Sequence, residues 1–386
     1  MRIAMLTYQC AMGGGSYLRS WSLAQALCRR GHRVTLFASR RRCGCKPRQY
    51  LHGPVEIVEM PALAPRRLRN GGFSIIDTIA RYRRLQSGTY DIVHAFDHRP
   101  AGAYPAWLQK HAPFISDWAD LWGSGGLADI RSGWERPLAF FDRKSEKWLH
   151  RKALAITAIS RYLLQIAKDL GYDHEHLLQL GVGANHQDIV PLAPEIARNK
   201  LQIAPGRPVL VHIGFAGNDL AFTRAAIANL QRLVPEVLVL CCGGSAEAIA
   251  HNFSSPVVRS FAILPYEELS TILSAAAIAL LPMVSCTLNQ ARLPNRFGDY
   301  LAAGKAVACS EVGDLPAIIR EEQIGIVTPA TPEAFAEGIA ALLADKARCR
   351  EYGLRARALA EGRYSWSALA EKLEAFYFRF AGRQSH

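Results

Sequence analysis

The chain has 386 residues, half of them hydrophobic, and a formal net charge of +13. This length excludes a single small domain and predicts two α/β domains of roughly 150–200 residues each. Because no apolar run approaches the roughly 20 residues that cross a bilayer, the sequence also excludes a protein built from transmembrane helices.

Basic residues gather in three clusters in the first hundred residues. A basic balance favours an anionic partner. Each cluster alone is typical of a solvated face, but three in one half favour an anionic membrane surface. The clusters lack interleaved aromatic residues or a recognisable reading motif, so we expect no nucleic acid partner. The clusters are Arg40, Arg41, Arg42, Lys46 and Arg48; Arg66, Arg67 and Arg69; and Arg81, Arg83 and Arg84.

The nine cysteines are expected to be reduced and cytoplasmic. Met1 and Arg2 run straight into an apolar segment, so we expect no signal peptide. Cys43 and Cys45 invite a metal interpretation, but no second ligand pair follows at zinc spacing. We therefore expect no metal and no cofactor, in a cytoplasmic protein that is peripheral at the inner membrane.

Strands and helices alternate along the first half of the chain. Residues 2–7 predict a strand, 11–16 a glycine loop, 17–30 a helix and 32–37 a second strand. This βαβ order indicates a parallel sheet. The later expected elements are strands over 55–58, 90–95, 114–115 and 153–159, and helices over 74–85, 101–110, 137–151 and 161–170.

The helix over 74–85 is expected to be amphipathic, with an apolar face and a basic face that favour contact with a membrane. Its apolar residues are Ile75, Ile76, Ile79 and Tyr82, and its basic residues are Arg81, Arg83 and Arg84.

After the glycines at 181 and 183 the alternation restarts, which indicates a hinge. We therefore expect two doubly wound parallel sheets, in domains over 1–183 and 184–364, followed by a closing segment over 365–386. The expected elements are strands over 208–213, 237–241, 257–258, 278–281 and 306–309, and helices over 222–233, 266–276, 294–303, 315–320, 332–344, 346–361 and 366–380.

Ligands of doubly wound sheets bind beyond the carboxyl ends of the strands. The loops at those ends are 10–16, 95–100, 116–126, 214–219, 243–245 and 283–298. Binding residues are therefore expected there.

Several short segments, taken in order, resemble the retaining GT-B glycosyltransferases of family 4. The resemblance covers nearly the whole chain, and the order and spacing of its motifs are more specific than any one motif. The motifs are Gly13-Gly14-Gly15 with 23–27 and 30–34, then 90–95, 157–160, 180–182, 299–308 with 312–316, and 364–366.

The resemblance implies two Rossmann-like domains that face each other across a cleft, with a last helix that returns to the first domain. It implies transfer of a sugar, with retention, from a nucleoside diphosphate donor to a saccharide or lipid-linked acceptor. Cell-surface polysaccharide biosynthesis is the expected setting.

Donor binding requires groups for the diphosphate and for the ribose. Arg292 and Arg296 flank the start of the helix over 294–303 and suit the phosphates. Asp299 lies where the resemblance places the ribose ligand, since a carboxylate can accept both vicinal hydroxyl groups. Further donor candidates are the loop glycines Gly14, Gly15, Gly214 and Gly243, and Asn295.

The acceptor hydroxyl must lose a proton, and the first domain offers three candidates. Asp117 and Asp120 lie in the segment where the family commonly carries a histidine, and His98 lies in a neighbouring loop. A carboxylate between aromatic residues has a raised pKa, closer to working pH. Asp120 is equally suited to an ordinary turn or helix cap.

The chain departs from the family pattern at three positions. Ala291 replaces the first of two glutamates, Ala119 replaces the usual histidine, and Phe215 stands where an arginine is expected. Asn289 or Asn295 could compensate at the donor end. The alternatives left open are a non-catalytic GT-B partner subunit and a GT-B sugar-nucleotide epimerase.

Overall fold

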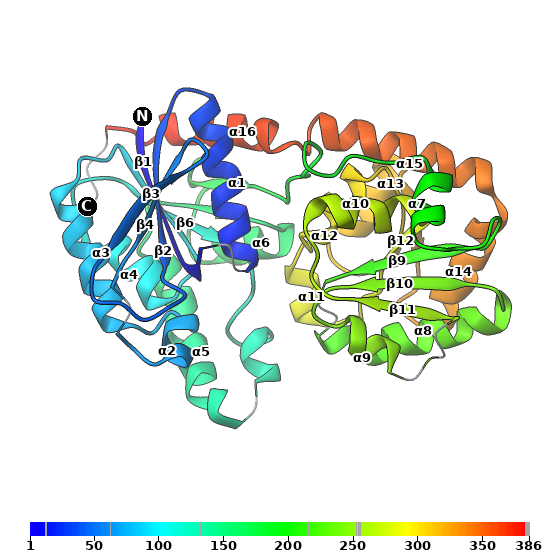
Figure 1. Cartoon of the computed structure of the whole chain (residues 1–386). Helices are drawn as coiled ribbons and strands as arrows, with labels where there is room; N and C mark the ends of the chain where they lie inside the picture. The colour runs from blue at the N-terminus through cyan, green and yellow to red at the C-terminus, as the bar shows by residue number, and fades with distance from the viewer. Residues whose placement is uncertain are drawn as a thin grey trace. The chain divides into compact units, whose positions relative to one another are not determined.

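The computed structural model describes residues 1–11, 14–61, 63–131, 133–214, 217–251, 253 and 256–382. The chain divides into two compact units (Figure 1). Unit 1 comprises residues 1–181 and 366–386, and unit 2 comprises residues 182–365. None of the helices in the described ranges is long and apolar enough to cross a membrane.

Unit 1 is built on an eight-stranded sheet with the order β3-β4-β2-β1-β5-β6-β7-β8. All neighbouring strands in the sheet are parallel except β3 and β4. The strands are β1 Arg2–Cys10, β2 Arg33–Ser39, β3 Arg48–His52, β4 Val55–Glu59, β5 Ile92–Phe96, β6 Phe114–Trp118, β7 Ala155–Ala158 and β8 Leu177–Gln179.

Helices cover both faces of this sheet. One apolar cluster joins the sheet to α1 and α16, including Leu27, Leu373 and Phe376. A second cluster joins the opposite face to α3, α4 and α5 through residues such as Leu85 and Leu149. The helices are α1 Gly15–Arg29, α2 Arg66–Asn70, α3 Ile75–Ser87, α4 Pro100–Leu108, α5 Arg136–His150, α6 Arg161–Asp169 and α16 Trp366–Phe378, with short 3₁₀ turns at Leu127–Ile130, Gly133–Glu135 and His174–His176.

The expectation of parallel pairing is wrong at one edge of unit 1. Strand β3, which the sequence did not predict, pairs antiparallel with β4. Only two residues separate the strands, and Gly53 among them has a φ of 56°, which a glycine adopts without strain. Four of the five β3 residues are exposed, so the strand shows little of the apolar pattern that would reveal it.

The expected basic face of α3 is wrong at Arg81, whereas Arg83 and Arg84 are exposed. Arg81 is fully buried and pairs with Asp77, Nε to Oδ1 at 2.6 Å. Its guanidinium also donates to the Thr7 carbonyl oxygen at 2.6 Å and to the Ser39 hydroxyl at 3.0 Å. The isoleucines are exposed too, and Ile75 is 74% exposed. The face of α3 that packs on the sheet therefore includes the satisfied Arg81–Asp77 ion pair.

Unit 2 contains a six-stranded parallel sheet with the order β11-β10-β9-β12-β13-β14. Figure 1 shows α8 and α9 on one side of this sheet and α10 and α12 on the other. The strands are β9 Val209–Ile213, β10 Leu238–Cys242, β11 Val258–Phe261, β12 Ile278–Leu281, β13 Ala306–Ser310 and β14 Gly325–Thr328. The helices are α7 Pro194–Lys200, α8 Leu220–Leu233, α9 Ala246–Ala250, α10 Tyr266–Ala275, α11 Thr287–Ala291, α12 Arg296–Ala302, α13 Leu315–Glu322, α14 Pro332–Ala344 and α15 Lys346–Glu361.

The expectation of two doubly wound sheets is confirmed. Strand β14 and helix α11 were not predicted. Helix α12 begins at Arg296 rather than at residue 294, because Pro294 and Asn295 form the turn that precedes it. With only seven residues, α12 offers little dipole, so any charge for an anion comes from side chains.

Candidate functional site

The strand order of unit 2 reverses between β9 and β12. From β9 the chain builds outward through β10 and β11, then returns to add β12, β13 and β14 on the other side of β9. Ligands of doubly wound sheets bind beyond the carboxyl ends at such a switch point. The residues after Ile213 and Leu281 therefore form the candidate ligand site of unit 2.

Helix α12 is fixed at this switch point by two side chains. The Tyr300 hydroxyl accepts from the Ile213 backbone N–H at 2.9 Å and donates to the Leu280 carbonyl oxygen at 3.2 Å. The Arg296 Nη1 donates to the Ile213 carbonyl oxygen at 3.1 Å. One helix thus bridges the ends of both strands, and the Arg296 guanidinium lies beside them.

Two glycines bring the strand ends close together. Gly214 has a φ of 88° and Gly243 a φ of 102°, both in the region that favours glycine. A Cβ atom on Gly243 would lie 3.1 Å from the Cα atom of Gly214. Because neither loop carries a side chain at this corner, backbone groups lie near the Arg296 guanidinium, whose Nη1 is 3.8 Å from where a Gly214 Cβ atom would be.

Arg292 lies next to this corner and pairs with the buried Asp219. The other carboxylate oxygen of Asp219 accepts from the Val284 backbone N–H at 2.9 Å and from the Asn289 side chain at 2.7 Å. Asp219 therefore orients Arg292. Sequence reasoning did not name Asp219, although it follows a predicted strand at the distance of a strand-end loop; Phe215, in the same loop, lies outside the described residues.

Asp299 lies one turn along α12, partly exposed. Its Oδ1 accepts from Asn185 at 2.9 Å, and the same amide group donates to the Tyr266 hydroxyl at 2.8 Å. Burial raises the pKa of Asp299 to about 7, against the opposing effect of the Asn185 hydrogen bond. Asn295 is exposed, and its side chain makes no capping hydrogen bond to α12.

Unit 1 has its own switch point, between β1 and β5. Gly14, with a φ of 86°, and Gly15 lie exposed at the start of α1, directly after β1. Met12 and Gly13 of the predicted glycine loop lie outside the described residues. The three polar candidates lie on β6 and in the loops that follow β5 and β6.

Asp117 is committed to contacts within unit 1. It is 1% exposed and pairs with both Nε and Nη2 of Arg19, at 2.9 and 3.0 Å. The Thr157 hydroxyl donates to the same carboxylate at 2.5 Å, and Arg19 also donates to the carbonyl oxygens of Leu180 and Gly181. This network connects α1, β6 and the chain after β8.

His98 is likewise committed. It is fully buried, and its Nε2 lies 2.9 Å from Oδ1 of Asp142. Burial lowers the pKa of His98 to about 4, so the ring is neutral near pH 7. Asp142 also accepts from Arg99 at 2.9 Å, and the Arg99 guanidinium lies over the rings of Phe73 and Trp122.

Asp120 is the partly exposed member of the three. It lies on the loop after β6, and Glu146 of α5 fixes this loop. The Glu146 carboxylate accepts from Trp118 Nε1 at 2.9 Å and from the backbone N–H groups of Trp122 and Gly123. The charge of Asp120 contributes to the raised pKa of Asp97. Over the described ranges no three His, Cys, Asp or Glu side chains are grouped as metal ligands.

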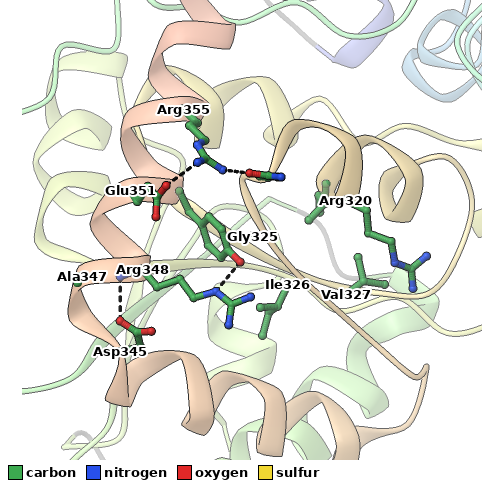
Figure 2. Close-up of a pocket in the computed structure, with 12 residues that line it drawn as sticks. Arg320, Gly325, Ile326, Val327, Asp345, Ala347, Arg348, Glu351 and Arg355 are labelled. Carbon is green, nitrogen blue, oxygen red and sulfur yellow. Dashed lines mark hydrogen bonds and ion pairs between the residues drawn. The ribbon is translucent and has the colours of Figure 1, made fainter.

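A hollow of about 810 Å³ lies elsewhere in unit 2, between α13, β14 and α15 (Figure 2). None of the predicted site residues lines it. Two of its arginines bond to other residues of the lining: Arg355 to Glu351 (Figure 2), and Arg348 Nε to the Tyr352 hydroxyl at 2.6 Å. The candidate residues lie at the switch points and not in this hollow.

Two family models match the chain in succession. The first, described as a glycosyl transferase 4-like domain, matches residues 14–183, and the second, described as glycosyl transferases group 1, matches residues 207–345. The chain belongs to the group 1 glycosyltransferases of the GT-B class. The second match includes β9 and β12 of the unit 2 switch point, and the first begins directly after β1 and includes β5.

Curated relatives of this glycosyltransferase include two bacterial enzymes. Alpha-maltose-1-phosphate synthase of Mycolicibacterium smegmatis is 26% identical over 60% of the chain and 65% of its own length. D-inositol 3-phosphate glycosyltransferase of Nocardia farcinica is 28% identical over 78% of the chain and 69% of its own length. The matched part thus spans about two thirds of these relatives.

Solved structures share the whole fold. Sucrose-phosphate synthase from Thermosynechococcus elongatus has a TM-score of 0.78 at 17% identity, and the match covers 98% of each chain. WaaG, a glycosyltransferase involved in lipopolysaccharide biosynthesis, has a TM-score of 0.71 at 18% identity, covering 98% of this chain and all of that one. Anabaena HepE with UDP and glucose bound has a TM-score of 0.69 at 15% identity over 98% of this chain and all of HepE.

Proposed function

We propose that this glycosyltransferase moves a sugar from a nucleoside diphosphate donor to a saccharide or lipid-linked acceptor, with retention of configuration. The observation that carries the proposal is the position of α12 at the β9/β12 switch point, where the helix carries Arg296 and Asp299 and Arg292 lies just before it. HepE, which shares the fold, is known with UDP and with UDP-glucose bound. Uridine nucleotides are therefore the first probes.

Each donor group has a matching chemistry in unit 2. We assign the diphosphate to Arg296 and Arg292, since guanidinium groups make strong charge-assisted hydrogen bonds to phosphate. Gly214 and Gly243 add no side chain at this corner, so a ligand can approach the backbone closely there. Asp299, once ionised, accepts from the ribose hydroxyl groups, and Asn295 contacts the donor from the exposed end of α12.

Unit 1 supplies the acceptor side in this proposal. Gly14 and Gly15 let the backbone approach a ligand at the start of α1. Among the polar candidates we assign the charge that assists proton loss to Asp120, because Asp117 is neutralised by Arg19 and His98 is held neutral beside Asp142. The last two then act by shaping the ends of β5 and β6.

A lipid-linked acceptor requires access to a membrane, and one surface of unit 1 suits that contact. Isoleucines of α3 are exposed next to Arg83, and on α5 Phe140 is 64% and Trp148 40% exposed near basic residues. Aromatic and basic side chains favour the interface of an anionic bilayer. We propose that this glycosyltransferase works at the cytoplasmic membrane face, in cell-surface polysaccharide synthesis.

A ligand screen by thermal shift tests the donor assignment. UDP and UDP-glucose are expected to raise the melting temperature, because a ligand at a hundred times its Kd stabilises the fold by about 2.7 kcal/mol. Uridine, which lacks the diphosphate, is expected to bind more weakly and to raise the melting temperature less. GDP and ADP sugars serve as matched alternatives for the base. No shift with any nucleoside diphosphate would contradict the proposal.

Incubation with UDP-glucose alone separates the two alternatives. An epimerase would form a new sugar nucleotide without any acceptor. A non-catalytic subunit would leave the donor intact whichever acceptor is added. A transferase is expected to release UDP faster when an acceptor is present, and the anomeric configuration of the product, read by NMR, tests retention.

A further inference from the structure

Asp97 is a strained and buried carboxyl group at the switch point of unit 1. It directly follows β5, and its φ is 98°, a region that residues other than glycine rarely adopt. The side chain is 3% exposed. Strain of this kind persists where the surrounding structure holds it, commonly at functional sites.

Side chains from α1, β1, β6, the loop after β6 and the start of α4 surround Asp97. Ser16, in the first turn of α1, hydrogen-bonds the carboxylate, but the Oδ2 atom has no hydrogen-bond partner within the described ranges. The titratable groups around it are Tyr8 on β1, Asp117 on β6, Asp120 after β6, and Arg99 at the start of α4.

This environment disfavours the ionised form of Asp97. Burial is the main cause, and the negative charges of Asp120 and Asp117 add to it, so the pKa of Asp97 lies well above its usual range. A protonated carboxyl group can donate one hydrogen bond and accept others, which matches the two-way bonding of a sugar hydroxyl group. A purely structural aspartate has no need of an unused oxygen atom at a ligand-binding strand end.

We propose that Asp97 contacts the substrate, holding a sugar hydroxyl group at the β1/β5 switch point through the Oδ2 atom that has no partner within the described ranges. Asp120 then carries the negative charge at that place. The assignment rests on the proposed glycosyl transfer and names a second carboxyl group in the same reaction. The hydroxyl group belongs either to the donor sugar or to the acceptor.

Two substitutions separate this role from a turn-forming one. Asp97→Gly removes the carboxyl group and relieves the positive φ, so the melting temperature should hold or rise. Asp97→Asn keeps the shape and both bonding directions, and asparagine tolerates positive φ. We expect Asp97→Gly to lower kcat/KM for UDP-glucose turnover about 100-fold, as removal of a positioned hydrogen-bond group does, and Asp97→Asn to keep activity within about tenfold.

Two assay arms identify the sugar. UDP release without acceptor reports on the donor sugar alone, and UDP release with isolated saccharide acceptors reports on transfer. A loss in Asp97→Gly confined to transfer assigns the acceptor hydroxyl group, and an equal loss in both arms assigns the donor.

The pH profile gives a readout that a structural role would not move. Wild-type turnover should fall on the alkaline side as Asp97 ionises, and Asp97→Asn should lack that fall. A folded Asp97→Gly with wild-type turnover and an unchanged profile would overturn the assignment. Wild-type protein that turns over no nucleotide sugar would instead remove the proposed function, and this assignment with it.

Discussion

The two switch points differ in how their charges are used. In unit 1 the buried charges neutralise one another: Asp117 pairs with Arg19, Asp142 with Arg99, and Asp77 with Arg81. In unit 2 one carboxylate orients one arginine and leaves α12 carrying Arg296 and Asp299 at the strand ends. The charges near the unit 1 strand ends are thus committed to buried ion pairs, whereas Arg296 and Asp299 lie on a helix at the strand ends of unit 2.

This difference teaches that a charged residue in a strand-end loop can have one of two roles: it can complete a buried ion pair, or it can bind a ligand. A buried ion pair stabilises only while it is complete, because removal of one partner leaves an uncompensated charge. A charged group that binds a ligand must instead be reachable, as Asp299 is by partial exposure and as Arg296 is at the end of β9. The predictions below test this division, from the largest expected effect to the smallest.

Asp117→Asn should destabilise unit 1 strongly. It leaves the Arg19 guanidinium buried without its carboxylate, which typically costs about 3–5 kcal/mol. Urea unfolding measures the loss. Asp129→Asn is the matched control, because the Asp129–Arg143 pair is exposed and worth less than about 1 kcal/mol. A stable Asp117→Asn protein that has lost turnover would return Asp117 to the catalytic candidates.

Asp299→Asn should lower the affinity for UDP about tenfold at pH 8, since a hydrogen bond to a charged group contributes about 1.5–3 kcal/mol. The pKa of Asp299 is about 7, so the carboxylate is mostly protonated at pH 6 and ionised at pH 8. Wild-type affinity should therefore rise with pH through 7. Calorimetric titrations at both pH values measure these affinities. If the affinity of Asp299→Asn for UDP depends on pH as the wild-type affinity does, Asp299 does not bind the ribose.

Ile75→Ser with Ile79→Ser should weaken binding to vesicles that contain anionic lipid by about tenfold, because the two side chains contribute exposed apolar area. Vesicle co-sedimentation measures it. Ile263→Ser in unit 2 is the control, since Ile263 is 83% exposed and lies outside the proposed surface. Equal losses in both proteins, or no binding by the wild type, would rule out this surface.

Asp97→Asn should stabilise the protein modestly above neutral pH. The pKa of Asp97 is raised in the folded state, so its stabilising contribution is complete at acid pH and is lost as the pH rises toward that raised value. The melting temperature of the variant should exceed that of the wild type at pH 8, and the gap should close toward pH 4. A gap that widens toward acid pH would mean that Asp97 is ionised in the fold.

Much of the architecture could be predicted because the signals are local. The helices over 332–344 and 346–361 match α14 and α15 residue for residue, since apolar periodicity and capping residues lie within each segment. The expected exposure of Arg81 on α3 is wrong for a non-local reason. Arg81 finds carbonyl groups of two strands that lie 74 and 44 residues away, and no pattern within the helix reveals them.

The candidate site divides in the same way. Residue types at strand ends indicated Arg292, Arg296 and Asp299, but their orienting partners Asp219 and Asn185 lie 73 and 114 residues away. In unit 1 the sequence could not tell Asp117 from Asp120, because only the fold brings Arg19 to one of them, 98 residues earlier in the chain. Pairing across such distances is a property of topology.

The most direct test of the donor site compares UDP with uridine. Calorimetric titration of wild type and Arg296→Met isolates the contribution of the phosphates, since the base and ribose are common to both ligands. Wild type should prefer UDP to uridine, and Arg296→Met should lose about 10–100-fold of that preference while its affinity for uridine is unchanged. An unaltered preference in a folded Arg296→Met protein would contradict the assignment of the diphosphate to α12.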